Sequence, residues 1–221
     1  MYKCRKHHID FIYRSVYDGF MNDKNDVKQN ILESALVLFS AKGYEGVAVS
    51  ELTTAAGITK PTLYYYFGSK KGLFDAVCQE NYGRLNRVIA DSAIYQANPE
   101  NYYEDINKTL HSLAYAYFTF AFKNETFYRL TMANLYVPCS SSVFDVVRKY
   151  HFEQYEIIGK MFQDMADAHS NLKGKDKRLA WSFIGAINAF IGLVWGGTTE
   201  DIHSDDTVKE FVHQFMHGIY A

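Results

Sequence analysis

The chain has 221 residues, of which 48% are hydrophobic, 22% charged and 16% aromatic, with a formal net charge of −2. These values are ordinary for a folded, soluble protein of one or two domains. The three cysteines are scattered without a Cys-x-x-Cys pair, which excludes a disulfide framework and predicts a reducing, cytoplasmic location. Long apolar patterns with a period of 3.6 residues predict an all-α fold.

Residues 1–23 carry no clear pattern. The segment opens with basic residues, but histidines and an aspartate interrupt any apolar core of a signal peptide. One interpretation places the native start at Met21, so that most of this extension is absent from the native protein. The alternative is a short helical arm built on Phe11, Val16 and Phe20.

Short helices follow in quick succession after residue 24. The first is predicted over residues 25–42 and ends at Gly43, a residue that favours a left-handed stop. Ser50 is expected to cap the second, which covers residues 51–56.

A turn at residues 57 and 58 leads to the third short helix. Thr59 is expected to cap it, and Pro61 sits in its first turn, where a missing N–H does no harm. Gly68 ends this helix, and Ser69 is expected to cap a long helix that follows.

Two short capped helices joined by a glycine turn are typical of a helix-turn-helix. A helical projection places Leu63 and Phe67 on the buried side of the second helix and turns hydroxyl-bearing residues outward. Phenol and hydroxyl groups donate to phosphate oxygens, and lysines at both ends would neutralise them. The alternative is an aromatic helical hairpin used for protein contacts.

Residues 31–77, ILESALVLFSAKGYEGVAVSELTTAAGITKPTLYYYFGSKKGLFDAV, resemble the DNA-binding region of the tetracycline-repressor (TetR) family. The resemblance implies a helix-turn-helix DNA-binding domain over residues 24–72 and a helical effector-binding and dimerisation domain over residues 73–221. It implies base contacts, phosphate contacts or capping by Ser50, Thr59, Lys60, Pro61, Thr62, Tyr64, Tyr65, Tyr66 and Lys70. Val49 and Ser50 provide fewer contacts than many relatives have at these positions.

The rest of the chain reads as longer helices. They are expected to open at Asn98-Pro99 and to cover residues 125–136, 142–168, 177–196 and 205–220. Residues 179–197 carry no charge and approach a bilayer-spanning length, but polar residues and four glycines make a buried helix the preferred interpretation.

A single reading helix contacts few bases, so specific binding calls for a two-fold dimer. The family places the dimer seam on the last two long helices. Small residues on the first and an apolar stripe on the second agree with a seam built from Gly185, Ala189, Gly192, Phe211, Phe215 and Ile219.

The middle helices are rich in aromatic rings. By resemblance they would surround an effector cavity for a flat or lipophilic small molecule, although simple core packing explains any single ring as well. The candidate lining residues are His111, Tyr115, Phe118, Phe122, Phe127, Asn134, Phe152 and Asn188.

The sequence therefore predicts a transcriptional regulator, in the first instance a dimeric repressor that an effector releases from palindromic double-stranded operator DNA. The alternative is a small-molecule-binding helical protein or enzyme without a DNA-binding role, but the chain has no Gly-x-Ser-x-Gly, His-Glu-x-x-His or phosphate-loop motif. No cofactor, metal or membrane partner is expected. His213 and His217 are four residues apart but lie opposite the apolar stripe, where a solvated face is expected.

Overall fold

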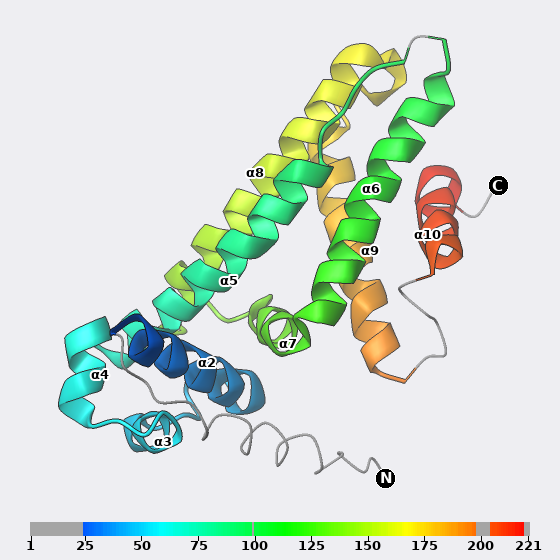
Figure 1. Cartoon of the computed structure of the whole chain (residues 1–221). Coiled ribbons are helices and arrows are strands. Elements are labelled where there is room, and N and C mark those ends of the chain that lie inside the picture. The colour runs from blue at the N-terminus through cyan, green and yellow to red at the C-terminus, as the bar shows by residue number, and fades with distance from the viewer. Residues whose placement is uncertain (1–23, 99, 198–203, 219–221) are drawn as a thin grey trace.

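The computed structural model describes residues 24–98, 100–197 and 204–218, and within these ranges it contains helices and no strand (Figure 1). The expected all-α fold is confirmed. The helices are α2 (Lys24–Lys42), α3 (Val49–Ala55), α4 (Lys60–Phe67), α5 (Lys70–Ser92), α6 (Tyr102–Lys123), α7 (Glu125–Asn134), α8 (Phe144–Ala168), α9 (Asp176–Trp195) and α10 (Asp205–His217), with a 3₁₀ turn at Ser170–Leu172.

The short helices α2, α3 and α4 form a head at one end of the molecule, and the longer helices form a body (Figure 1). Helices α5 and α8 run side by side in the same direction, from the head to the far end. Helix α6 returns toward the head, and α9 and α10 complete the body. Because α5 starts three residues after α4 ends, the head is continuous with the body.

Side-chain caps set the boundaries of α4 and α5 as expected. The Thr59 hydroxyl accepts a hydrogen bond from the backbone N–H of Thr62 at 3.4 Å, and the Ser69 hydroxyl accepts from Gly72 N–H at 3.0 Å. Gly68 between them has φ = 70°, a conformation that favours glycine.

The expected cap at Ser50 is wrong. Ala48 is the N-cap of α3, and its backbone N–H donates to the carboxylate of Glu51 at 2.9 Å. This bond starts the helix earlier than the sequence suggested and leaves Ser50 exposed in the first turn. Similarly, α6 is capped by Asn101, whose side chain accepts from Glu104 N–H, and not by Asn98-Pro99.

A buried aromatic cluster joins the head to α5. The Phe39 ring lies edge-on to Phe74, with 5.2 Å between centroids, and Tyr44 packs edge-on against the same ring at 5.1 Å. A hydrogen bond of 2.7 Å from the Ser142 hydroxyl to the Glu45 carboxylate adds a second tie, between the head and the segment before α8. These contacts fix the head on the body.

The apolar stripe of α10 is largely used within its own chain. Val208 and Val212 are fully buried, and Phe211 and Phe215 lie against Phe183 of α9. Both rings remain partly exposed, so their expected place at a dimer seam stays a prediction. Ile219 lies outside the described residues.

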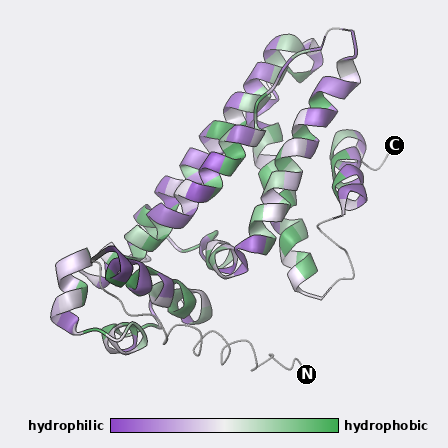
Figure 2. Ribbon diagram, in the orientation of Figure 1, coloured by the Kyte–Doolittle hydropathy of each residue, from purple (hydrophilic) through white to green (hydrophobic). Residues whose placement is uncertain are grey.

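Helix α9 is the one helix in the described ranges that is long and apolar enough to cross a bilayer by length and composition, and 33% of its most apolar window is buried. Figure 2 shows hydrophobic residues along much of it. Its buried side, which includes Phe183, Ile187 and Ile191, packs inside the bundle.

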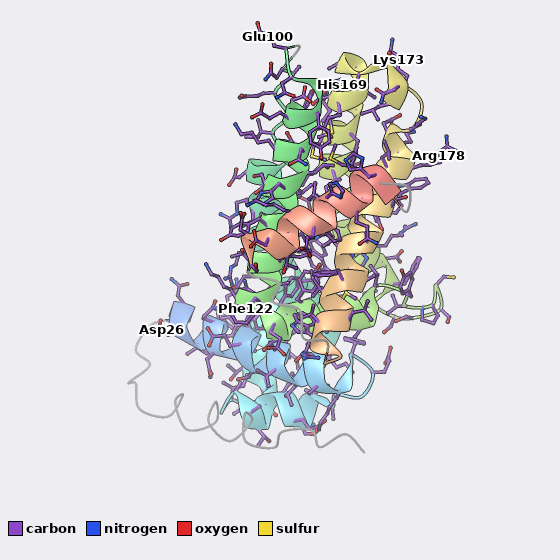
Figure 3. All side chains as sticks on the ribbon, turned by 90° about the vertical axis from the view of Figure 1, so that its right-hand side faces the viewer. Asp26, Glu100, Phe122, His169, Lys173 and Arg178 are labelled. Atoms are coloured by element: carbon purple, nitrogen blue, oxygen red, sulfur yellow. The ribbon has the colours of Figure 1, made fainter. Side chains whose placement is uncertain are left out.

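A buried polar network closes the far end of the bundle, where His169 lies (Figure 3). The Asp105 carboxylate accepts from Tyr95 O–H at 2.7 Å and Asn98 N–H at 2.9 Å, and lies 3.1 Å from His169 Nε2. Burial raises the pKa of Asp105, but these hydrogen bonds, one from Ile106 N–H and the charge of His169 outweigh it, so the pKa is lowered.

We expect Asp105→Asn to lower the free energy of unfolding by about 1–3 kcal/mol, because an amide cannot accept from every donor that the carboxylate serves. A depressed carboxyl pKa contributes stability above its unfolded value, and this stability is lost as pH falls through the folded pKa. Denaturant unfolding at several pH values should therefore show a steeper acid loss in the wild type than in Asp105→Asn. Identical acid profiles would contradict this role.

Candidate nucleic-acid interface and effector cavity

The exposed side of α4 is aromatic and polar. Leu63 is fully buried, whereas Tyr64 is 46% and Tyr65 75% exposed. Lys60 and Pro61 are also exposed at the start of the helix. The expected outward position of Tyr65, with Tyr64 on the flank of the helix, agrees with the structure. A large exposed tyrosine has little to gain from water alone, so a partner surface is expected here.

Three expected contact residues are partly engaged within the chain. The Thr62 hydroxyl lies 2.9 Å from that of Thr59, so each already has a hydrogen-bonding partner. Tyr66 is half-buried rather than outward, because its ring folds toward Phe67 (6.1 Å between centroids) and meets Tyr65 edge-on at 5.2 Å. The Tyr66 ring therefore supports the exposed Tyr65 more than it faces a partner.

Lys70, expected to contact a phosphate, also has contacts within the chain. Its ammonium donates to the backbone carbonyl of Val47 at 2.8 Å and lies 4.2 Å from the centre of the Tyr44 ring. The side chain thus ties the start of α5 to the segment between α2 and α3. An ammonium has three donors, so one bond to Val47 leaves capacity for another acceptor.

Positive charge on the head comes from a small number of lysines. Lys42 is paired with Glu51, whereas Lys60 and Lys71 are exposed and make no ion pair within the described residues. Phenolic hydroxyls and unpaired ammonium groups are the donors that contact the phosphate backbone of DNA. The arrangement is therefore suited to a polyanion, with α4 presenting its exposed side to it.

A cavity of about 360 Å³ opens in the body between α7, α8 and α9. This volume lies at the lower end of the range typical of small-molecule sites. The lining residues are Asn134, Leu135, Val137, Phe144, Val147, Arg148, His151, Phe152, Tyr155 and Trp181. Two residues proposed from the sequence, Asn134 and Phe152, are among them.

The other six proposed pocket residues do not line this cavity. Phe118 and Phe127 are buried in ring clusters, Asn188 accepts a 2.6 Å hydrogen bond from Tyr128, and His111 lies 2.9 Å from the Asp205 carboxylate. Tyr115 and Phe122 are exposed on α6. Most of these side chains are taken up by packing or pairing between helices, which the sequence pattern did not distinguish from a pocket wall.

Sequence reasoning missed the polar residues of the cavity. His151 lies on the buried side of α8, and Arg148 places its guanidinium 5.5 Å from the Phe144 ring centre and 3.4 Å from the Asp145 carboxylate. A signal existed, because His151 and Gln154 occupy apolar-stripe positions of α8, three residues apart. Polar residues in such positions mark either a buried network or a ligand site.

Hydrogen bonds connect the cavity wall to α5. His151 Nε2 lies 2.8 Å from the Tyr82 hydroxyl, and burial lowers the pKa of His151 to about 4, so the imidazole is neutral near pH 7. The neighbouring Tyr150 stacks on Tyr82 and donates to the Asp75 carboxylate at 3.0 Å. The wall of the cavity is thus bonded to the helix that begins directly after α4.

No group of three metal-ligating side chains occurs in the part of the chain that the structure describes. His213 and His217 are exposed, with ring centroids 4.5 Å apart, and His217 also meets the Tyr103 ring.

The head of the molecule is similar to known proteins. The model of "Bacterial regulatory proteins, tetR family" matches residues 31–77. IcaR of Staphylococcus aureus, a negative transcriptional regulator of a biofilm operon, is 33% identical over 76 residues, which are 34% of this chain and 39% of IcaR. The transcriptional repressor NicS of Pseudomonas putida is 36% identical over 73 residues, which are 33% of this chain and 34% of NicS.

Solved structures match the whole fold. A putative fatty acid metabolism regulator of Clostridium perfringens superposes with a TM-score of 0.70 at 23% identity, covering 86% of this chain and 98% of that one. FadR of Bacillus subtilis, solved with stearoyl-CoA, has a TM-score of 0.69 at 16% identity, with the same coverage. The head thus resembles the TetR family of bacterial regulatory proteins over residues 31–77, the chain spans well under half the length of the curated relatives it matches, and the solved structures share its fold.

Proposed function

We propose that the protein is a dimeric, non-enzymatic transcriptional repressor of the cytoplasm, which binds operator DNA through α4 and is released by a small lipophilic or aromatic effector. The observation that carries the proposal is the exposed side of α4. Tyr64, Tyr65 and Lys60 are exposed there, while the buried Leu63 anchors the helix to the head. In a helix-turn-helix the second helix enters the major groove with its N-terminal end foremost.

The cavity and its bonds to α5 support control by an effector. A ligand against His151 would act on Tyr82 and, through Tyr150, on Asp75 in the second turn of α5. A difference of about 1–3 kcal/mol between the two states would shift operator affinity about 5–150-fold. Aromatic and aliphatic walls favour a lipophilic ligand, and the stearoyl chain of the stearoyl-CoA bound to FadR of Bacillus subtilis is lipophilic.

The exposed side of α9 supports the dimer. Trp181 is 57% and Leu193 62% exposed, and Gly185 and Ala189 lie between them in steps of four residues. An antiparallel copy could approach closely over the small residues, with the large side chains at either end, and no charged residue from 179 to 197 would oppose it. The larger share of the seam is therefore assigned to α9, with α10 at its edge.

We expect Lys60→Ala to weaken binding to DNA from upstream of its own gene without changing stability, because Lys60 is exposed and unpaired. Fluorescence anisotropy at several salt concentrations should show the slope of log K against log salt reduced by about 0.9 for each lost phosphate contact. Lys173→Ala, at the far end of the body, is the matched control. Equal affinities and slopes for wild type and Lys60→Ala would contradict the placement of α4 on DNA.

Lys70→Ala should behave differently from Lys60→Ala. Lys70 donates a hydrogen bond to the Val47 carbonyl, and it also lies at the start of α5, the end of that helix expected to be near DNA. We expect a loss of about 1 kcal/mol in unfolding free energy together with weaker operator binding. Parallel denaturant unfolding and anisotropy measurements would separate the two effects. Unchanged stability in Lys70→Ala would show that the bond to Val47 contributes little.

Ala189→Arg should produce a monomer with poor operator affinity, because a buried arginine at a two-fold seam faces its own copy. The chain has two tryptophans, so Trp195→Phe leaves Trp181 as the sole reporter. In that background, dimer formation should protect Trp181 from acrylamide quenching, and Ala189→Arg should abolish the protection. A dimer in which Trp181 stays as accessible as in the monomer would exclude this seam.

A further inference from the structure

A side-chain hydrogen bond joins the head to the segment between α7 and α8. The Ser142 hydroxyl donates to the Glu45 carboxylate at 2.7 Å, although the two residues are 97 positions apart in the sequence. Both residues are exposed, so water competes for the same donor and acceptor and the net contribution of the bond to stability is small. A bond of this strength can break and form again while the helices on both sides stay folded.

Glu45 lies in the turn between α2 and α3. The Lys70 ammonium at the start of α5 holds the same turn from another side, because it donates to the Val47 carbonyl at 2.8 Å. The next residue, Ala48, is the N-cap of α3, and α3 packs on α4. The position of this turn relative to the body therefore helps to determine where the exposed side of α4 lies.

Ser142 belongs to a segment whose two ends lie on the cavity. Val137, just before the segment, and Phe144, just after it, both line the cavity of about 360 Å³. Residues 138–143 connect these two positions outside α7 and α8, and we name them the rim segment. A ligand in the cavity would contact both ends of the rim segment, and hence the part of the chain that carries Ser142.

Hydrogen-bonded turns make the rim segment stiff. Ser141 N–H donates to the Pro138 carbonyl at 2.8 Å, and Phe144 N–H donates to the Ser141 carbonyl at 3.1 Å. Val143 is only 1% exposed and anchors the segment in the core. Because the segment has little slack, a displacement of Phe144 moves Ser142 relative to the head.

Helix α7 adds a second contact between the cavity and the head. Figure 1 shows α7 beside α2, and the two helices pack against each other. The last residue of α7, Asn134, lines the cavity together with Leu135. The head is therefore in contact with α7 and the rim segment, which form one side of the cavity, and this connection does not pass through α5.

We infer that the hydrogen bond between Ser142 and Glu45 is a latch that holds the head in its DNA-binding position, and that Ser142 is a positioning residue that acts through Glu45. A ligand in the cavity displaces the rim segment, opens the latch and lets the head leave that position. This inference rests on the proposed function and deepens it, because it names a route of regulation separate from α5.

The first test follows the rim segment itself. Cys139 lies in it and is an exposed free thiol, so a nitroxide attached there reports its motion by electron paramagnetic resonance. Cys78 is buried, and a Cys4→Ser background removes the other thiol. We expect Ser142→Ala to raise the ratio of mobile to immobile label by about 2- to 10-fold, because one hydrogen bond is lost. Ser140→Ala, at an exposed serine of the same segment, is the matched control and should leave the ratio unchanged.

The second test measures DNA binding by fluorescence anisotropy. Ser142→Ala should weaken binding to DNA from upstream of the protein's own gene by about 2- to 10-fold, with the wild-type salt slope, because no phosphate contact is lost. Ser142→Thr keeps the hydroxyl and should bind as the wild type does. In a Glu45→Ala background, Ser142→Ala should have no further effect, since the bond is already absent. A lower melting temperature with unchanged DNA affinity in Ser142→Ala would show a purely structural role and overturn the inference.

The third test fills the cavity without a ligand. Leu135→Trp and Phe144→Trp each enlarge a partly exposed side chain of the cavity lining. We expect either variant to raise the mobility of the label at Cys139 and to weaken DNA binding, and to have a smaller effect on both when combined with Ser142→Ala. Thermal melting checks that each variant is folded.

Unchanged label mobility in Ser142→Ala would overturn the latch, as would mobility and DNA affinity that neither tryptophan variant alters. Both results would leave the proposed function standing, because α5 would still connect the cavity to the head. Failure of the wild type to bind DNA would instead refute the proposed function and, with it, the role of the latch.

Discussion

Burial of Leu63 is the constraint on which the exposed side of α4 depends. Its side chain is fully enclosed, so the helical repeat turns Tyr65 to the outer side of α4, while Tyr64 on the flank and Lys60 at the start of the helix are also exposed. The N-cap Thr59 and the C-cap Gly68 hold α4 to about two turns, too short to be stable alone. The head therefore presents its donors because the packing beneath α4 is rigid.

Control of the head by an effector would also require that the head and the cavity belong to one packed structure. Helix α5 begins just after α4, and Tyr82 and Asp75 on it are bonded to His151 and Tyr150 of α8. A ligand that displaces His151 changes contacts on α5 directly, without a flexible linker that would absorb the movement. Coupling of this kind needs two arrangements of α5 relative to α8, which the effector would populate unequally.

Sequence reasoning predicted the helices well because apolar period and caps are local signals, as Thr59 and Ser69 illustrate. It was wrong at the start of α3, where the Ala48 N–H donates to Glu51 and the helix begins before Ser50. It also did not predict that Lys70 donates to the Val47 carbonyl or that the α10 stripe packs on α9 of its own chain. These choices depend on contacts between distant segments, which periodicity does not encode. For the same reason the cavity polar residues were missed, although α8 carried the signal.

Hydroxyl-radical footprinting on DNA upstream of its own gene tests the central claim most directly, because it reports where a pair of α4 helices sits on the duplex. The account predicts two symmetric protected patches whose centres are separated by about one helical turn, ~34–36 Å, or a multiple of it. A single patch, or no protection at concentrations where the protein is dimeric, would contradict the account.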